Sequence, residues 1–207
     1  MHIVIEGQDA TGKDTQAQLL ADYLRSKGQN VVHYSESGTA SEDPFVQKIA
    51  KLNYGTKQDI DHRTRVLLYL INRYEQWRKL AEPTLKNGDT VITTRNWYST
   101  LIYEGYAGGV SRNLIRHIHK EVMPERYFSP DKIVILTLSD EDRAKRLADQ
   151  ASKTGRVGEV FKSKGDSFQH KLNSAYLKVA KDENIPTLDT AGTVEEVHEK
   201  LKKLFKL

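Results

Sequence analysis

Nine residues near the start of the chain constrain its fold more than any other segment. The run Gly7-Gln8-Asp9-Ala10-Thr11-Gly12-Lys13-Asp14-Thr15 follows the short apolar segment 2–6 and precedes a stretch with helical periodicity. Glycines five residues apart allow a tight turn whose backbone N–H groups point at phosphate oxygens, and the following helix adds its positive N-terminal end. The order of strand, glycine loop, lysine and helix therefore predicts a phosphate-binding loop.

This loop predicts an ATP-binding site formed by residues 7–15, in which Lys13 reaches the β- and γ-phosphates. Where such loops carry Ser or Thr to hold Mg²⁺, the chain has Asp14. Carboxylates are suitable Mg²⁺ ligands, so Asp14 is a candidate metal ligand. The alternative is that Asp14 caps the helix and favours its positive end.

Composition narrows the class of protein further. The 207 residues are enough for one α/β domain spanning residues 1–207, with a net charge of +4. No basic stretch is interleaved with aromatics, so we expect no nucleic-acid partner. The absence of cysteine excludes disulfides and thiolate zinc sites. The longest apolar run, 66–71, is too short to cross a bilayer, and no signal-like leader opens the chain, so we expect a cytoplasmic protein without membrane contact.

Short apolar runs alternate with helical patterns along the whole chain. The predicted strands are 3–5, 31–34, 91–93, 133–138 and 187–188. Such alternation is typical of an α/β fold, here a doubly wound, mostly parallel five-stranded sheet with helices on both faces.

Four helical patterns lie between or after these strands. They are expected at 16–24, from 61 to about 85, from about 141 after Ser139, and after Thr193. The second is the longest. Its apolar stripe consists of Val66, Leu67, Leu70, Ile71, Tyr74, Trp77 and Leu80.

The segment 151–166 lacks a clear period and is rich in glycine and in basic residues, among them Lys153 and Arg156. It can be a mobile basic loop, or a lid that closes cations over phosphates. Because long loops in compact domains are usually functional or disordered, we expect a basic lid.

Several motifs, in order, resemble those of thymidylate kinases, which are nucleoside-monophosphate kinases with the P-loop fold. Residues 5–16 (IEGQDATGKDTQ) resemble FEGxDGxGKTTQ, 71–76 (INRYEQ) resemble ANRWEQ, and 94–105 (TRNWYSTLIYEG) resemble DRYxxSxxAYQG. Residues 130–131 and 188–192 match in placement. The resemblance covers nearly the whole chain and implies the P-loop kinase architecture.

The resemblance also implies an activity. A thymidylate kinase transfers the γ-phosphoryl group of ATP to dTMP, giving dTDP and ADP with Mg²⁺, and the family resemblance suggests a homodimer that packs through helices. Two alternatives remain open from the sequence. One is a kinase for another (deoxy)nucleoside monophosphate or for a deoxynucleoside, and the other is a nucleotide-binding relative without turnover.

By the same resemblance, five residues would hold the acceptor. Asp9 would bond the 3′-hydroxyl of the deoxyribose, and Tyr103 would pack against its 2′ position. Tyr69 would stack on the base while Arg73, four residues later on the same helix face, donates to a base carbonyl. Arg95 follows the third strand and would hold the transferring phosphate with Lys13, as catalytic residues. Without the resemblance, Asp9 can equally bond local backbone, and Tyr69 can be a core residue.

Two departures from the family pattern concern the metal. Thr94 replaces an Asp that lies near Mg²⁺, and Asp14 replaces the Ser or Thr of the phosphate loop. The chain thus lacks a carboxylate at position 94, on one side of the metal, and carries one at position 14, on the other side. We expect Asp14 to compensate for Thr94.

Other departures concern the acceptor. Thr100 and Glu104 stand at positions that touch the base and its surroundings, and Glu104 replaces the usual Gln. After the second strand, the chain keeps Glu36 but lacks the family's Arg near the acceptor phosphate. Glu36 can hold water or metal, or be an ordinary solvated residue. The acceptor phosphate would then rely on Arg95 and on a lid cation, with Arg156 as the catalytic candidate.

Overall fold

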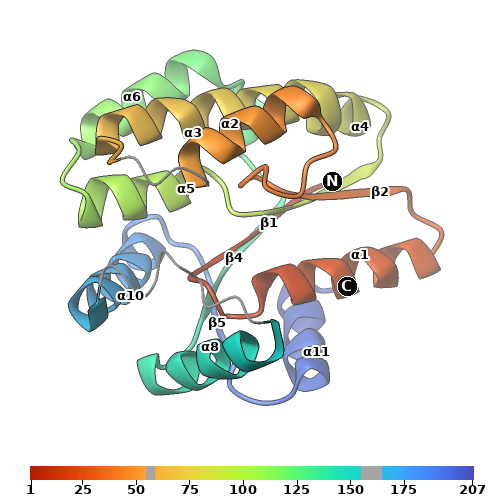
Figure 1. Ribbon diagram of the computed structural model, residues 1–207. Helices are drawn as coiled ribbons and strands as arrows, with labels where there is room; N and C mark the ends of the chain where they lie inside the picture. Colours follow the sequence, from red (N-terminus) through yellow and green to blue (C-terminus); the bar gives the residue numbers. More distant parts are fainter. Residues whose placement is uncertain (55–58, 155–164) are drawn as a thin grey trace.

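The computed structural model describes residues 1–54, 59–154 and 165–207 (Figure 1). Five parallel strands form one sheet in the order β2-β3-β1-β4-β5. Their bounds are β1 His2–Gly7, β2 Val31–Ser35, β3 Thr90–Thr94, β4 Lys132–Thr137 and β5 Thr187–Asp189. The predicted sheet is confirmed, and each strand overlaps the apolar run that predicted it. The sheet is parallel throughout.

Helices cover both faces of this sheet (Figure 1). The α-helices are α1 Lys13–Ser26, α2 Pro44–Tyr54, α3 His62–Gln76, α4 Glu82–Lys86, α5 Trp97–Thr100, α6 Arg112–Val122, α7 Glu125–Phe128, α8 Asp140–Thr154, α10 Gly165–Asp182 and α11 Val194–Phe205. Two π-helical stretches are η1 Trp77–Ala81 and η2 Leu101–Ala107. Among the described residues, no helix combines the length and the apolar character needed to cross a membrane.

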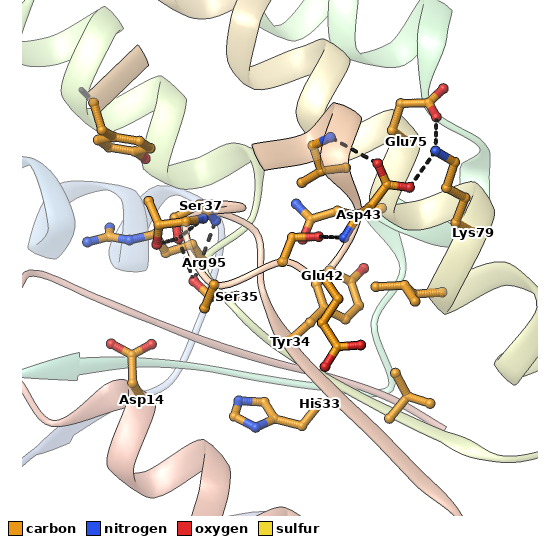
Figure 2. Close-up of a pocket in the computed structure, with 18 of the residues that line it drawn as sticks. Asp14, His33, Tyr34, Ser35, Ser37, Glu42, Asp43, Glu75, Lys79 and Arg95 are labelled. Atoms are coloured by element: carbon orange, nitrogen blue, oxygen red, sulfur yellow. Dashed lines mark hydrogen bonds and ion pairs between the residues drawn. The ribbon is translucent and has the colours of Figure 1, made fainter. Parts of the chain in front are cut away.

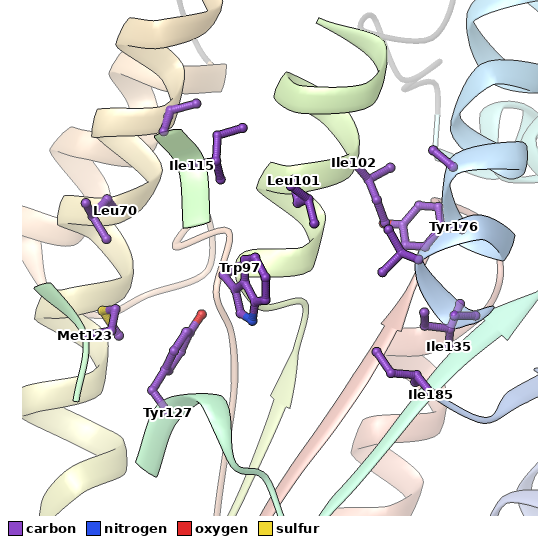
Figure 3. Packing of buried hydrophobic residues seen from close by; sticks show 14 of the residues in the cluster. Leu70, Trp97, Leu101, Ile102, Ile115, Met123, Tyr127, Ile135, Tyr176 and Ile185 are labelled. Atoms are coloured by element: carbon purple, nitrogen blue, oxygen red, sulfur yellow. The ribbon is translucent and has the colours of Figure 1, made fainter. Parts of the chain in front are cut away.

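Alternate residues of the strands enter two separate cores, as period-two side-chain direction requires. Ile3 and Ile5 of β1 pack with α1 and α11 on one face. Ile135 of β4 packs on the other face with helices that include α3, α5 and α10. Figure 3 shows this second core, where Trp97 and Tyr176 approach the sheet from two different helices. Both faces of β1 are therefore buried, which explains its continuous apolar run.

The helix expected from 61 to about 85 begins at His62 and is not regular throughout. The π-helical η1 interrupts it, and α4 follows. Pro83 has no backbone N–H to donate to the carbonyl four residues earlier, so the regular bonding pattern cannot run through it. Single π-helical turns such as η1 are a known irregularity within α-helices.

The expected apolar stripe on this helix divides into two faces. Val66, Leu70 and Trp77 are buried in the core. By contrast, Leu67 is 53% exposed and Ile71 is 42% exposed. Tyr74 and Leu80 are exposed as well. Their exposure leaves an apolar strip on the outside of α3 that the core does not explain.

The order of strands fixes where ligands can bind. β1 lies between β3 and β4, and the connections from β1 and β3 leave at the same carboxyl edge of the sheet. In open α/β sheets, ligands bind at this edge, where neighbouring connections diverge to opposite faces. The phosphate loop and Arg95 both lie there.

We predict that His119 makes stability depend on pH. Its Nδ1 lies 2.8 Å from the carbonyl oxygen of Ile115, and its side chain is fully buried. Burial and the positive charge of Arg73 lower the pKa of His119 from 6.5 to about 3. Only the unfolded chain takes up this proton between those values. The free energy of unfolding should therefore decrease as the pH is lowered from about 6.5 to about 3, by up to about 1.4 kcal/mol per pH unit.

Urea unfolding at a series of pH values measures this effect, with His119→Gln as the comparison. Glutamine can donate to the same carbonyl but does not titrate. The variant should therefore lose stability less steeply as the pH is lowered from about 6.5 to about 3. Parallel curves for the two proteins would contradict the prediction.

Candidate active site

The phosphate loop connects β1 to α1 in a conformation that needs glycine at its ends. Gly7 has a φ of 150°, and a Cβ there would lie 2.8 Å from the carbonyl oxygen of Leu136. Gly12 precedes α1 with a φ of 82° and, within the described chain, no side chain caps this helix. The first backbone N–H groups of α1 therefore remain available for an anion.

Lys13 lies at the centre of the loop and is almost completely buried, with 6% of its side chain exposed. Its Nζ lies 3.2 Å from Oδ1 of Asp9 and 3.4 Å from Oδ2 of Asp14. Contacts with two carboxylates fix the buried ammonium group in position. The loop thus holds a localised positive charge where phosphate would enter.

Asp9 joins the loop to Arg95, the first residue after β3. An Arg95 guanidinium nitrogen bonds Oδ1 of Asp9, and the other donates to Oγ of Ser99 at 3.2 Å. Burial alone would raise the pKa of Asp9, but Arg95 and Lys13 together hold it below its usual range. Arg95 has a φ of 68°, which is rare for a residue with a side chain and occurs preferentially at functional sites.

A carboxylate that sequence reasoning did not assign to the site secures this arrangement. Glu6, the penultimate residue of β1, is completely buried. Its Oε1 accepts hydrogen bonds from the backbone N–H of Asn96 at 2.7 Å and of Ser99 at 3.1 Å, and the Ser99 hydroxyl donates to Oε2 at 2.9 Å. The only available signal was a charged residue within an otherwise apolar strand.

Arg73 and Glu36 form a second buried cluster. Nε of Arg73 donates to Oε2 of Glu36 at 2.8 Å, and NH2 donates to the Asn96 carbonyl at 2.8 Å. The hydroxyl of Tyr127 donates to the same Glu36 oxygen at 2.9 Å, and NH1 of Arg73 bonds Thr100. Burial raises the pKa of Glu36 to about 7, although Arg73 and Tyr127 oppose the rise. Glu36 is 2% exposed, so it supports Arg73 rather than facing solvent.

Aromatic rings lie beside both arginines. The guanidinium of Arg73 lies 5.5 Å from the ring of Tyr69, as their spacing on one helix face requires. The guanidinium of Arg95 lies 5.6 Å from the ring of Tyr103. Tyr54, at the end of α2, packs edge to face on Tyr69 at 5.8 Å and was not anticipated from the sequence.

Glu104 is also buried at this end of the site, with 5% of its side chain exposed, and it forms an ion pair with His62. Burial raises the pKa of Tyr69, and the negative charge of Glu104 adds to the rise.

Asp14 and Thr94, the two departures expected to compensate each other, are in contact. The Thr94 hydroxyl donates to Oδ1 of Asp14 at 2.7 Å, while 65% of the Asp14 side chain is exposed. Burial would raise the pKa of Asp14, but Lys13 and Thr94 hold it below its usual range. Among the described residues, no three acidic, His or Cys side chains gather into a metal site. Asp14 is an accessible carboxylate that fits Mg²⁺ if phosphate oxygens and water complete the coordination.

Two cavities meet at the phosphate loop. The larger, of about 740 Å³, is lined by Asp9, Tyr54 and Arg95 and by residues after β2, among them Ser37 and Asp43 (Figure 2). The smaller, of about 480 Å³, lies on the other side of the loop beside Arg146 and Thr190. Lys13 and Asp14 line both cavities.

Arg146 of α8 is a further residue that the sequence analysis missed. Its NH2 donates to the Thr190 carbonyl at 2.6 Å, which holds the guanidinium at the edge of the smaller cavity. No local pattern distinguishes it from the other basic residues of its helix. Arg156 lies outside the described residues, as does most of the expected lid at 151–166, and the side chain of Lys153 is not described.

The fold and this loop define a P-loop nucleotide-binding protein, and comparisons identify its family. The family model for thymidylate kinase matches residues 5–201. The probable thymidylate kinase of Thermococcus onnurineus is 31% identical, covering 96% of this chain and 93% of its own. The thymidylate kinase of Mesoplasma florum is 31% identical over 99% of this chain and 94% of its own.

A solved structure supports the fold. The crystal structure of thymidylate kinase from Ehrlichia chaffeensis superposes with a TM-score of 0.77, covering 100% of this chain and 98% of the other at 23% identity. The chain belongs to the thymidylate kinase family, and it is a nucleoside-monophosphate kinase.

Proposed function

We propose that the chain transfers the γ-phosphoryl group of ATP to dTMP, giving dTDP and ADP, with Mg²⁺ as cofactor. The observation that carries this proposal is the pair of cavities that share Lys13 and Asp14. Phosphoryl transfer requires a donor and an acceptor whose phosphates meet at one positively charged point. The smaller cavity would take ATP. The larger, which Asp9 and Arg95 line but Tyr69 and Arg73 do not, would take the phosphate and deoxyribose of dTMP.

On the donor side, the loop amides and Lys13 bind the phosphates, while the nucleoside lies along Arg146. Asp14 would hold Mg²⁺, which supplies charge neutralisation for the donor phosphates when it is bound. The Thr94 hydroxyl donates to Oδ1 of Asp14 at 2.7 Å and so holds its carboxylate in one orientation.

On the acceptor side, Arg95 binds the dTMP phosphate with its planar guanidinium fork. Asp9 bonds the 3′-hydroxyl, and Tyr103 fills the space beside the 2′ carbon. Tyr69 stacks on thymine and Arg73 donates to a base carbonyl. Thr100 and Glu104 lie beside these two at the base end, and Glu36 acts through Arg73, which it holds in place.

In the reaction, an oxygen of the dTMP phosphate attacks the γ-phosphorus, and the bond from that phosphorus to the β,γ-bridging oxygen breaks. ADP leaves with the electron pair. The protein needs to position the two groups and neutralise charge rather than form covalent bonds. Arg95 and Lys13 approach the reacting phosphates from the acceptor and donor sides.

We predict ADP release with ATP and Mg²⁺ in the presence of dTMP, measured by a coupled assay against dTMP, dUMP, dCMP, dGMP, UMP and thymidine. Lys13→Met should lower kcat at least about a hundredfold, because it removes the charge shared by both cavities. An exposed lysine such as Lys86 provides the matched control, since Lys86→Met leaves both cavities unchanged.

The other acceptors decide between the alternatives. Turnover of another monophosphate in place of dTMP would show that the site selects a different base. Turnover of thymidine alone would require a base near a 5′-hydroxyl, a role for which Glu36 is poorly placed because Arg73 and Tyr127 enclose it. ATP binding without turnover of any acceptor would contradict the proposed activity.

Asp14 yields a second prediction. Asp14→Ser should raise the Mg²⁺ concentration that gives half-maximal rate by about tenfold or more, because it leaves the metal without a carboxylate on either side. Asp14→Ser combined with Thr94→Asp should regain part of the loss, since the carboxylate returns from the opposite side. An Asp14→Ser enzyme with an unchanged Mg²⁺ requirement would show that Asp14 only favours the helix end.

We further propose a homodimer formed through α3 and α6. The support is an exposed apolar face on these adjacent helices, composed of Leu67, Ile71, Tyr74, Leu114 and Val122. Several apolar side chains exposed together on packed helices are typical of protein interfaces.

Ile71→Asp should convert the protein to a monomer, because it places a charge in the apolar interface. Light scattering after size exclusion measures the mass, and Leu177→Asp on α10 is the control, since Leu177 is equally exposed away from this face. A monomeric unsubstituted chain, or a dimeric Ile71→Asp, would contradict this proposal.

A further inference from the structure

The segment 35–39, which begins with the last residue of β2, presents three hydroxyl groups to the larger cavity. Ser35, Ser37 and Thr39 line this cavity together with Arg95. Successive residues of an extended chain point to opposite sides, so the two residues between them are buried. Figure 2 shows Ser35 and Ser37 on the same side of the cavity as Arg95. We call the three side chains the hydroxyl row.

The opposite side of this segment is fixed to α3. Oε2 of Glu36 accepts a hydrogen bond from Nε of Arg73 at 2.8 Å. Nδ2 of Asn72 donates to the carbonyl oxygens of Glu36 at 3.2 Å and of Ser37 at 3.0 Å. A Cβ at Gly38, where φ is 72°, would lie 2.4 Å from the same nitrogen, so this close approach needs glycine. The hydroxyl row is therefore held in place before any ligand binds.

The three hydroxyls are bonded to one another. Oγ of Ser35 lies 3.0 Å from Oγ of Ser37, which lies 3.0 Å from Oγ1 of Thr39. The backbone N–H groups of Ser37 and Thr39 donate to Oγ of Ser35 at 3.4 Å and to Oγ of Ser37 at 3.5 Å. Three O–H groups serve two bonds within the row, so one hydrogen is left at one end of the row for a ligand.

The Ser35 end of the row lies at the carboxyl edge of the sheet, where Arg95 also lies. Ser35 pairs in register with Thr94, which directly precedes Arg95. The backbone N–H of Glu36 donates to the Thr94 carbonyl at 3.0 Å, so the two strands stay together up to this edge. One wall of the cavity thus carries a guanidinium group and a neutral hydrogen-bond donor, a combination that suits a phosphate.

We propose that the hydroxyl row binds the phosphate of the acceptor nucleotide, with Ser35 as the direct donor, in a chain that lacks the family's arginine after the second strand. This inference rests on the proposed function. An anion at Ser35 selects the direction in which Thr39 donates to Ser37 and Ser37 to Ser35. Each bond then polarises the next, which strengthens the bond from Ser35 to the phosphate. Arg95 supplies the positive charge.

The test is calorimetric binding of dTMP, with thymidine measured by its competition with dTMP. For Ser35→Ala we expect the Kd of dTMP to rise about tenfold, because a hydrogen bond to a charged group is lost. The Kd of thymidine should not change, because thymidine has no phosphate. In steady-state kinetics the KM of dTMP should rise while the KM of ATP stays the same. Ser35→Thr keeps the hydroxyl and should bind dTMP as the unsubstituted chain does.

Two further variants test the row itself. Ser37→Ala leaves the direct donor in place but removes the hydroxyl that polarises it, so the Kd of dTMP should rise less, about threefold. Ser41→Ala is the matched control, because Ser41 lines the same cavity but lies outside the hydroxyl row. It should leave the Kd of dTMP and of thymidine unchanged.

The outcomes separate this inference from the proposed function. An unchanged Kd of dTMP in Ser35→Ala, with normal dTMP turnover by the unsubstituted chain, would overturn the inference alone. An equal rise in the Kd of dTMP and of thymidine would also overturn it, because the loss would then not concern the phosphate. If the unsubstituted chain neither binds nor phosphorylates dTMP, the proposed function and this inference both fail. If Ser35→Ala does not fold, the same comparison with Ser37→Ala decides.

Discussion

The hydrogen bonds of Glu6 hold the two halves of the site together. This carboxylate is fully buried at the end of β1, where an ionised group is costly unless its oxygens are paired. Its partners are the backbone N–H groups of Asn96 and Ser99 and the Ser99 hydroxyl, all in the segment after β3. The phosphate loop follows β1 and Arg95 follows β3, so the bonds of Glu6 fix the distance between the phosphate loop and Arg95.

Arg73 on α3 has a rigid support of its own. Arg73 is 2% exposed, and it donates to Glu36, to Thr100 and to the Asn96 carbonyl. A guanidinium bonded from several directions loses little further freedom when a substrate binds. Asn96 links the two supports, because its N–H binds Glu6 and its carbonyl binds Arg73. The strand that precedes the phosphate loop and the helix α3 are thereby connected through one short segment.

Much of the fold could be predicted from the sequence because it depends on local patterns. Apolar runs bounded by turn residues gave the positions of all five strands, and the glycine spacing identified the phosphate loop. The carboxyl edge of a parallel sheet then placed Arg95 beside it. The spacing of Tyr69 and Arg73 likewise determines that they share a helix face.

The rest depends on contacts between residues distant in the chain. No local pattern distinguishes Arg146 from other arginines, and its role follows from where α8 meets Thr190. The ion pair between His62 and Glu104 forms only because η2 brings Glu104 to the start of α3. The exposure of Leu67 could not be read from helical periodicity, which locates apolar residues but does not say whether the core or another chain covers them.

We propose that Lys13 lies where a donor cavity meets an acceptor cavity. A crystal structure with an adenosine and a thymidine joined through a chain of phosphates tests it most directly. We expect adenosine beside Arg146, phosphates on Lys13 and the phosphate loop, and thymidine between Arg95 and Tyr69. Thymidine bound outside the cavity lined by Asp9 and Arg95, or phosphates away from Lys13, would contradict it.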